Sequence, residues 1–312
     1  MLNSLGFILG TALMYSTPLI YTALGGVISE NSGVINIGLE GMMTIGALIG
    51  ATVGFYSGNP WLAFLAAGLS GAVLALLHAI ASISFGADQV VSGIAINFLG
   101  PGLALFLSRI FFKGATMTES IPLNRKMPRP FNGLFPRNSF FDMIFNQYAT
   151  VYVALILVLL FWYLLYRTKL GLRIRAVGEH PKAADTLGVN VYYIRYFCVI
   201  LSGILAGFGG ASMSLAIVSN FTPTLVSGHG FIALAAMIFG KWKPQGAMWA
   251  CLLFGASNGL VVYLGRSGST ITISQQILSM IPYLVTLIIL TGFVGRAVAP
   301  ASNGIPYQKG EN

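Results

Sequence analysis

The chain has 312 residues, of which 56% are hydrophobic and only 8% are charged. A soluble domain carries roughly 25% charged residues, so this composition excludes a water-soluble globular protein and indicates an integral membrane protein. The net charge of +9 comes chiefly from lysines and arginines in two connecting segments, 109–137 and 167–195. This distribution is typical of loops that face the cytoplasm or anionic lipid, and it argues against nucleic-acid binding.

The apolar runs predict the helices. A helix needs about 20 apolar residues to cross a hydrocarbon core of ~30 Å. The first 29 residues carry no charge, so the first run is expected to be a helix of the mature protein and not a signal peptide. A further run, 229–240, is too short to span and predicts a half-helix or a re-entrant segment. The eight runs of sufficient length lie at about 5–28, 33–56, 61–85, 88–111, 148–166, 192–218, 247–265 and 276–295.

We therefore predict an all-α integral membrane protein, a polytopic bundle of about 8–10 transmembrane helices forming a single domain over residues 1–312. Two loops interrupt it: a long polar stretch at 112–147 and a basic stretch at 167–191. If 167–191 is cytoplasmic, counting back five spans places the N-terminus and 112–147 outside. Glycines at 46, 50 and 54, and at 203 and 207, form small-residue ladders that predict close helix packing.

The most informative segment is 25–47, which places four polar side chains in or beside an apolar stretch: Glu30, Asn31, Asn36 and Glu40. A carboxylate near the bilayer centre costs at least ~2.5–3.5 kcal/mol and normally faces a cavity or a partner. Asn36 and Glu40 share one helical face, and nearby glycines favour an irregular backbone. The segment is either part of a substrate pathway or a polar clamp between helices.

Other polar residues within apolar segments have two interpretations each. Asn97 lies mid-helix and either lines a polar route or bonds across helices. His229, between two glycines at the start of the short segment, either approaches the pathway or serves the start of that helix. His78 is expected to be a satisfied interhelical residue. Asp88 is expected to cap the helix that follows it.

No catalytic constellation is found in the sequence. It contains no P-loop motif, no nucleophile elbow and no pair of histidines at metal-ligand spacing, so we expect no enzyme activity, no catalytic residue, no metal site and no cofactor in this chain. Cys198 and Cys251 lie in apolar runs and are expected to be buried thiols.

Three stretches resemble a known family: GGVISENSGVINIGLEGMM at 25–43, HGFIALAAMIFGKWKPQGA at 229–247 and IPYLVTLIIL at 281–290. They are similar to permease subunits of binding-protein-dependent ABC importers, in the group with the ribose and branched-chain amino-acid permeases, and most like the nucleoside (guanosine-type) branch. The resemblance implies a type II-like importer permease in a bacterial cytoplasmic membrane. It also implies three protein partners: an ATPase that uses ATP and Mg²⁺, a second homologous permease, and an extracellular substrate-binding lipoprotein.

The resemblance assigns the basic loop a role as well. Its stretch GLRIRAVGEHPKAADTLGV, 171–189, matches the cytoplasmic coupling loop, whose short helix sits in a groove of the ATPase. The glycines at 178 and 188 are expected to bound a helix of about two turns. An ordinary positive-inside loop is the alternative. The residues implied in coupling are Gly171, Arg173, Arg175, Gly178, Glu179, Ala183, Ala184 and Gly188.

The sequence thus predicts one half of a permease that imports a nucleoside by alternating access, with Asn36, Glu40, Asn97 and His229 as candidates for the pathway. A permease for a simple sugar such as ribose is the alternative cargo assignment. A secondary carrier with Glu40 as a proton carrier is a different class of mechanism.

Overall fold

The computed structural model describes residues 2–265, 280, 284 and 297–309, in which the regular elements are helices and no strand occurs. Within these residues seven elements are long and apolar enough to cross a membrane, which confirms the predicted all-α membrane fold. The α-helices are α1 (Leu2–Asn31), α2 (Leu39–Ser57), α3 (Pro60–Ala79), α4 (Gln89–Phe111), α5 (Phe140–Phe145), α6 (Ala149–Arg167), α7 (Lys169–Glu179), α8 (Pro181–Thr186), α9 (Val191–Ser212), α10 (His229–Phe239) and α11 (Pro244–Leu264). Two π-helical turns, η1 (Ile80–Ser84) and η3 (Met213–Ile217), extend α3 and α9, and η2 (Leu123–Arg125) is a 3₁₀ turn.

Most predicted spans agree with the helices to within a few residues. One boundary is wrong: the second span does not begin at 33, because residues 32–38 are not helical and α2 begins at Leu39. Conversely, α1 continues through the polar residues 29–31 instead of ending near 28. The eighth predicted span, 276–295, lies outside the described residues apart from two isolated positions.

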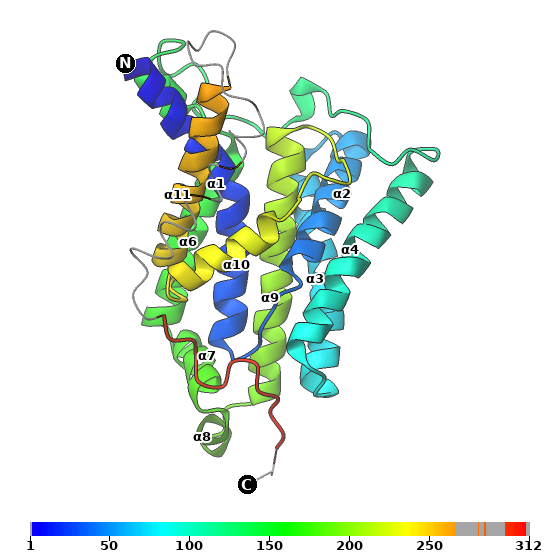
Figure 1. Cartoon of the computed structure of the whole chain (residues 1–312), viewed down its shortest axis with the longest axis vertical. Coiled ribbons are helices and arrows are strands. Elements are labelled where there is room, and N and C mark those ends of the chain that lie inside the picture. The colour runs from blue at the N-terminus through cyan, green and yellow to red at the C-terminus, as the bar shows by residue number, and fades with distance from the viewer. Residues whose placement is uncertain (1, 266–279, 281–283, 285–296, 310–312) are drawn as a thin grey trace.

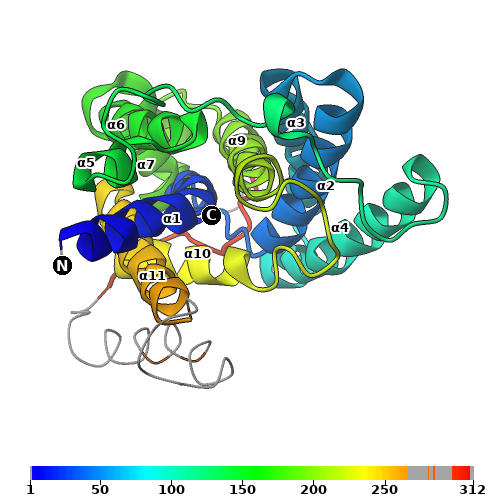
Figure 2. The ribbon, with the colours of Figure 1, turned by 90° about the horizontal axis from the view of Figure 1, so that it is seen from above.

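The bundle is organised around α1 and α9. Helix α1 packs against α9 and α11, while α9 also packs against α2 and α3. Figure 2 shows α4 on the outer side of α2, away from α1. Its outward side chains are large and apolar, among them Phe98 and Phe106, as expected of a helix that faces lipid.

Glycine ladders bring the central helices together, as the sequence predicts. A Cβ at Gly46 would lie 2.6 Å from the Cα of Gly207, and one at Gly50 would lie 3.3 Å from the Cβ of Ala211. Gly203 of α9 also meets the backbone of Gly71 on α3. Helices in lipid gain their packing energy from such close backbone approach.

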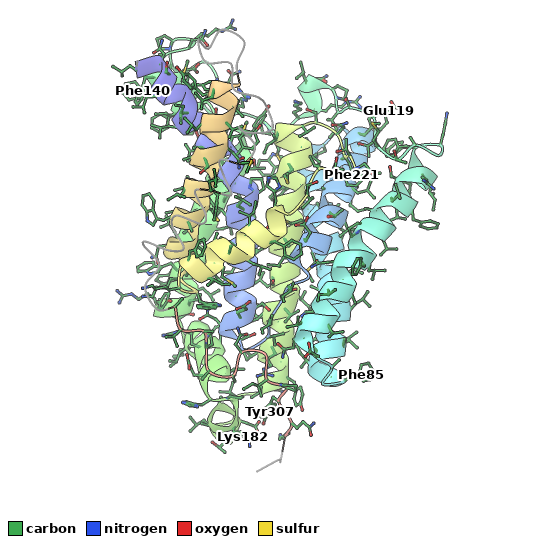
Figure 3. The ribbon with its side chains drawn as sticks, in the orientation of Figure 1. Phe85, Glu119, Phe140, Lys182, Phe221 and Tyr307 are labelled. Atoms are coloured by element: carbon green, nitrogen blue, oxygen red, sulfur yellow. The ribbon has the colours of Figure 1, made fainter. Side chains whose placement is uncertain are left out.

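The two predicted loops lie at opposite ends of the bundle. Residues 112–147, including α5, lie at the end that holds the N-terminus, while α7, α8 and the segment 297–309 lie at the other (Figure 1). Figure 3 shows Glu119 and Phe140 at the first end and Lys182 and Tyr307 at the second. We call these the N-terminal end and the α8 end.

The predicted half-helix is present as α10, which crosses the middle of the bundle at a slant (Figure 1). Before it, the chain returns from the N-terminal end, where Phe221 O accepts a hydrogen bond from Thr118 N at 3.1 Å. After it, Trp242 lies beside the end of α1, since its carbonyl accepts from Asn31 Nδ2 at 3.1 Å. A coil and a half-helix together therefore cover the distance that one long helix would cross.

Candidate functional site

The helix break between α1 and α2 is held by side chains of α1, α3 and α4. Ser29 Oγ donates to Val34 O at 2.7 Å. The ring of His78, on α3, lies with Nε2 2.9 Å from Ile35 O and Nδ1 2.9 Å from Ser92 Oγ, which confirms it as a satisfied interhelical residue. Gln89 Oε1 accepts from Ile35 N at 2.7 Å. Side chains thus replace the hydrogen bonds that a continuous helix would form for itself.

Asn36 is fully buried and sets the start of α2. Its Oδ1 accepts from Gly38 N at 3.1 Å, and its Nδ2 donates to Ser202 Oγ on α9 at 3.0 Å. The first contact is the turn by which asparagine commonly opens a helix. The second fixes that turn against α9.

Asn97, on α4, is bonded to the same turn from the other side. Its Nδ2 donates to Ile37 O and its Oδ1 accepts from Gly41 N, both at 2.9 Å. The two helices meet backbone to backbone here, because Gly41 and Gly100 leave no room for a Cβ on either side. Asn97 therefore does bond across helices, and it satisfies an amide and a carbonyl at the N-terminus of α2 that have no intrahelical partner.

Glu40 joins the first turn of α2 to the N-terminus of α10. Its Oε1 accepts from Gly228 N and its Oε2 from Gly230 N, each at 2.6 Å. The first amides of a helix lack intrahelical partners and carry partial positive charge, so they form a favourable site for a carboxylate. The two N–H groups and both helix dipoles thus stabilise the half-buried charge of Glu40.

The glycines around His229 make this contact feasible. Gly228 has φ of 89°, a left-handed conformation that glycine adopts without strain. A Cβ at Gly230 would lie 2.6 Å from the Cα of Glu40 and 2.7 Å from its carboxylate. The His229 ring turns back, with Nδ1 against the carbonyl of Val226, so this histidine supports the start of α10.

The structure therefore brings Asn36, Glu40, Asn97 and His229 together around one junction, which we call the α2–α10 junction (residues 36–41 and 228–230, with Asn97). The described polar contacts of these side chains are mostly with backbone groups. They hold together two broken elements deep in the bundle, as the clamp interpretation expects. Discontinuous helices meeting in this way are the usual setting of substrate sites in transporters.

The basic loop forms α7 and α8, bounded by turns close to the predicted ones. Gly171 and Gly178 are buried where a Cβ would collide with the backbone of α6 and with the carbonyl of Asn31, respectively. Gly188 has φ of 80° and follows α8. Gly171 and Gly178 thus allow the loop to pack tightly against the α8 end of the bundle.

The charged residues of α7 differ in exposure. Arg173 is exposed, whereas Arg175 is half-buried and its guanidinium lies 5.0 Å from the centroid of the Tyr166 ring. Glu179 Oε2 accepts from Ala301 N at 3.2 Å. Of these three charged side chains, only that of Arg173 is available for an ionic contact with another protein.

Helix α8 presents a small exposed face. Ala184 is buried and fixes the helix to the bundle, while Ala183 faces out beside Lys182 and Leu187, the latter 84% exposed. An alanine between a lysine and a leucine is flat enough for a close protein contact. This face lies at the outermost part of the α8 end (Figure 3).

Two features were not predictable from the sequence. Glu30 accepts hydrogen bonds from Trp242 and Asn303, and the segment 297–309 crosses the α8 end and bonds to α7 and α9. Glu30 stands out in the sequence as a charge in an apolar stretch, but no local pattern connects it to partners more than 200 positions away.

The described part of the chain has seven candidate spans, two broken elements joined at a buried polar junction, and an exposed helical loop at one end. These features are those of a subunit of a membrane transport system. The chain belongs to the permease family described as branched-chain amino acid transport system / permease component, which matches residues 8–290. It is a multi-pass protein of the cytoplasmic membrane, as predicted.

Several curated relatives match the chain along nearly its whole length. The guanosine ABC transporter permease protein NupQ of Bacillus subtilis is 45% identical, and the nucleoside ABC transporter permease protein NupC of Lactococcus lactis is 42% identical; each match covers 98% of both chains. The putative glucose ABC transporter permease protein TsgC13 of Haloferax volcanii is 37% identical over 93% of this chain and 92% of its own. The family assignment made from residues 25–43 and 229–247 is confirmed.

Proposed function

We propose that this chain is the pore-forming subunit of an ABC importer that passes a nucleoside across the cytoplasmic membrane by alternating access. The observation that carries the cargo assignment is identity of 45% and 42% to permeases named for guanosine and nucleosides, over 98% of each chain. The clamp at the α2–α10 junction is compatible with this role, because a permease needs a broken element whose position differs between its inward and outward states.

We infer three partners, which the membership of the permease family supports. A separate ATPase, using ATP and Mg²⁺, supplies the energy; a second homologous permease completes the pore; and an extracellular lipoprotein delivers the cargo. In this arrangement the α8 end is cytoplasmic and the loop 112–147 extracellular. The chain itself hydrolyses nothing and holds no cofactor.

Within this assembly, Asn36, Glu40, Asn97 and His229 serve the pathway. Glu40 and His229 are half-buried at the start of α10, where a carboxylate and an imidazole can reach the hydroxyl groups of a ribose. Asn36 and Asn97 do not contact the cargo themselves; they fix the turn that carries Glu40. Each oxygen of Glu40 accepts one hydrogen bond, from Gly228 N or Gly230 N, and a carboxylate oxygen has a further acceptor position for a cargo hydroxyl.

Residues 171–189 couple the chain to the ATPase. The exposed face of α8, with Ala183, Lys182 and Leu187, enters a groove on that partner, and the exposed Arg173 meets acidic residues at its rim. The buried residues Gly171, Gly178 and Ala184 keep α7 and α8 rigid against the bundle. Gly188 ends the helix, while Arg175 and Glu179 hold α7 to α6 and to residue 301.

Reconstitution tests this function. The two permeases, the ATPase and the binding protein are incorporated into liposomes, and uptake of labelled guanosine is followed with ATP on the cytoplasmic side. We expect uptake that requires ATP hydrolysis and stops with a hydrolysis-deficient ATPase. Guanosine uptake that needs only a proton gradient, with this chain alone, would establish the carrier mechanism instead.

A simple sugar is the second candidate cargo, favoured by the 37% identity to the permease named for glucose. Nucleosides and ribose share the sugar hydroxyls, so pathway residues alone do not separate the two. Competition does: excess guanosine should abolish uptake and excess ribose or glucose should leave it unchanged. The reverse result would assign the sugar.

A further inference from the structure

Glu30 occupies a position at which three parts of the α8 end meet. It is 6% exposed and lies at the end of α1. Its Oε2 accepts from Trp242 Nε1 at 2.6 Å and from Asn303 Nδ2 at 2.9 Å. Trp242 belongs to the turn between α10 and α11, and Asn303 belongs to the segment 297–309.

The segment 297–309, which we call the strap, is bonded to α7. Ser302 N donates to Gly178 O at 2.9 Å, and Ser302 Oγ donates to Val177 O at 3.2 Å. Ala301 N donates to Glu179 at 3.2 Å. The strap is therefore attached to the C-terminal end of α7 by these hydrogen bonds.

The strap is also bonded to α9. Arg195 Nη1 donates to Ile305 O at 3.0 Å, and Tyr192 Oη donates to Tyr307 O at 3.2 Å. Arg195 is 1% exposed, so its contact lies beneath the strap. Figure 3 shows Tyr307 at the α8 end, the end that also holds Lys182 of α8.

The turn bearing Trp242 is fixed to α10. Lys241 and Trp242 both have φ of 54°, a conformation in which side-chain-bearing residues are strained. Trp242 N donates to Met237 O at 3.1 Å. The backbone at Trp242 is therefore tied directly to the last turn of α10.

We propose that Glu30 is the residue through which movement of α7 and α8 reaches α10, by way of the strap and Trp242. This inference rests on the proposed function, in which α8 follows the ATPase and α10 borders the pathway. A buried carboxylate is costly to leave without donors, so Trp242 and Asn303 stay bonded to it while the parts move. Glu30 is thus a positioning residue that touches no cargo.

The test uses the reconstituted complex with Trp242→Phe, Asn303→Ala and Glu30→Gln. Trp242→Phe keeps the aromatic ring and removes only the Nε1 donor. In each of the three variants we expect the amount of guanosine taken up per ATP hydrolysed to fall about tenfold, while ATP hydrolysis itself continues. Trp249→Phe, in a residue that is 67% exposed on α11, is the matched control and should keep the wild-type ratio.

The double variant Trp242→Phe/Asn303→Ala separates linkage from general damage. The hydrogen bonds of Trp242 and Asn303 to Glu30 act in series, so breaking either one already interrupts the connection. The double variant should therefore have nearly the same uptake per ATP as the more impaired single variant. An unchanged ratio in Trp242→Phe, or a proportional fall of uptake and hydrolysis together, would overturn the proposal.

A second readout does not depend on the cargo. Spin labels at Lys169→Cys on α7, outside the proposed ATPase contact, and Ile238→Cys on α10, both exposed, report the distance between these helices with and without ATP. We expect an ATP-dependent change that Trp242→Phe abolishes. A change that survives Trp242→Phe overturns the inference, whereas absence of guanosine uptake by the wild-type complex counts against the proposed cargo alone.

Discussion

Glu30 and Glu40 hold opposite ends of the half-helix α10. Glu40 binds the amides of Gly228 and Gly230 at its start, and Glu30 binds the indole of Trp242 just beyond its end. The two carboxylates flank the break between α1 and α2, since Glu30 lies at the end of α1 and Glu40 in the first turn of α2. Two acids ten positions apart therefore fix an element that follows them by 188 to 212 positions.

Replacing Glu40 with glutamine should destabilise the folded chain. The amide keeps one acceptor oxygen for two backbone donors and loses the charge that the helix N-terminus favours. Hydrogen bonds to charged groups contribute about 1.5–3 kcal/mol each, so we expect a loss of about 2 kcal/mol in the free energy of unfolding. Denaturation of the purified protein in detergent measures it.

Glu119→Gln is the control, because Glu119 is exposed on the loop 112–147 and its replacement should change stability by less than about 0.5 kcal/mol. Equal stability of the Glu40→Gln and Glu119→Gln proteins would show that the α2–α10 contact contributes little to folding.

Adding one methyl group at Gly230 should displace α10. The new Cβ would lie 2.6 Å from the Cα of Glu40, a backbone atom that cannot move aside. Overpacking of this kind costs about 1–3 kcal/mol. We expect a lower Tm and reduced uptake for Gly230→Ala, measured by thermal unfolding and by the liposome assay.

Gly102→Ala provides the comparison, since nothing lies within 4 Å of a Cβ at Gly102. Alanine favours a helix over glycine by about 1 kcal/mol, so this variant should be as stable as the wild type or more so. If the Gly230→Ala protein matched it, the close approach of α2 and α10 would not constrain the fold.

Much of the fold could be predicted because membrane helices are determined by local composition. Apolar length predicted eight spans, and seven of them are spanning helices within the described residues. The spacing of Gly46, Gly50 and Gly54 predicted close helix packing, although it did not identify α9 as the partner of Gly46 and Gly50. Asp88 caps α4 as expected, with its side chain accepting from Val91 N at 2.9 Å. Each of these signals depends on residues close together in the sequence.

The site could be predicted only in part, because its contacts are long-range. Asn36, Glu40 and Asn97 stood out as costly polar residues, but their partners did not. The second span was expected to start at 33, and it starts at 39 because Asn36 and Asn97 replace the missing helical hydrogen bonds. The polar end of α1 stays helical because Trp242 and Asn303 satisfy Glu30.

The α2–α9 ladder should be sensitive to small increases in volume. Gly46→Ala would bring a Cβ to 2.6 Å from both the Cα and the carbonyl oxygen of Gly207. Since helix association in lipid depends on this close packing, we expect a loss of about 1–3 kcal/mol. The Gly102→Ala variant again controls for the change in helix propensity, and equal unfolding free energies would contradict the prediction.

Charge reversal in α7 tests the coupling loop, and the structure separates its two arginines. Arg173 is exposed, so Arg173→Glu should leave stability within about 0.5 kcal/mol of wild type while weakening ATPase binding and guanosine uptake. Arg175 stacks on Tyr166, so Arg175→Glu should lower stability by about 1 kcal/mol through loss of that contact. Copurification of the ATPase measures the first effect and thermal unfolding the second.

The double variant Arg173→Glu/Arg175→Glu should insert in the membrane but hydrolyse ATP without uptake of guanosine. Full uptake by the double variant would show that α7 does not couple through its charge.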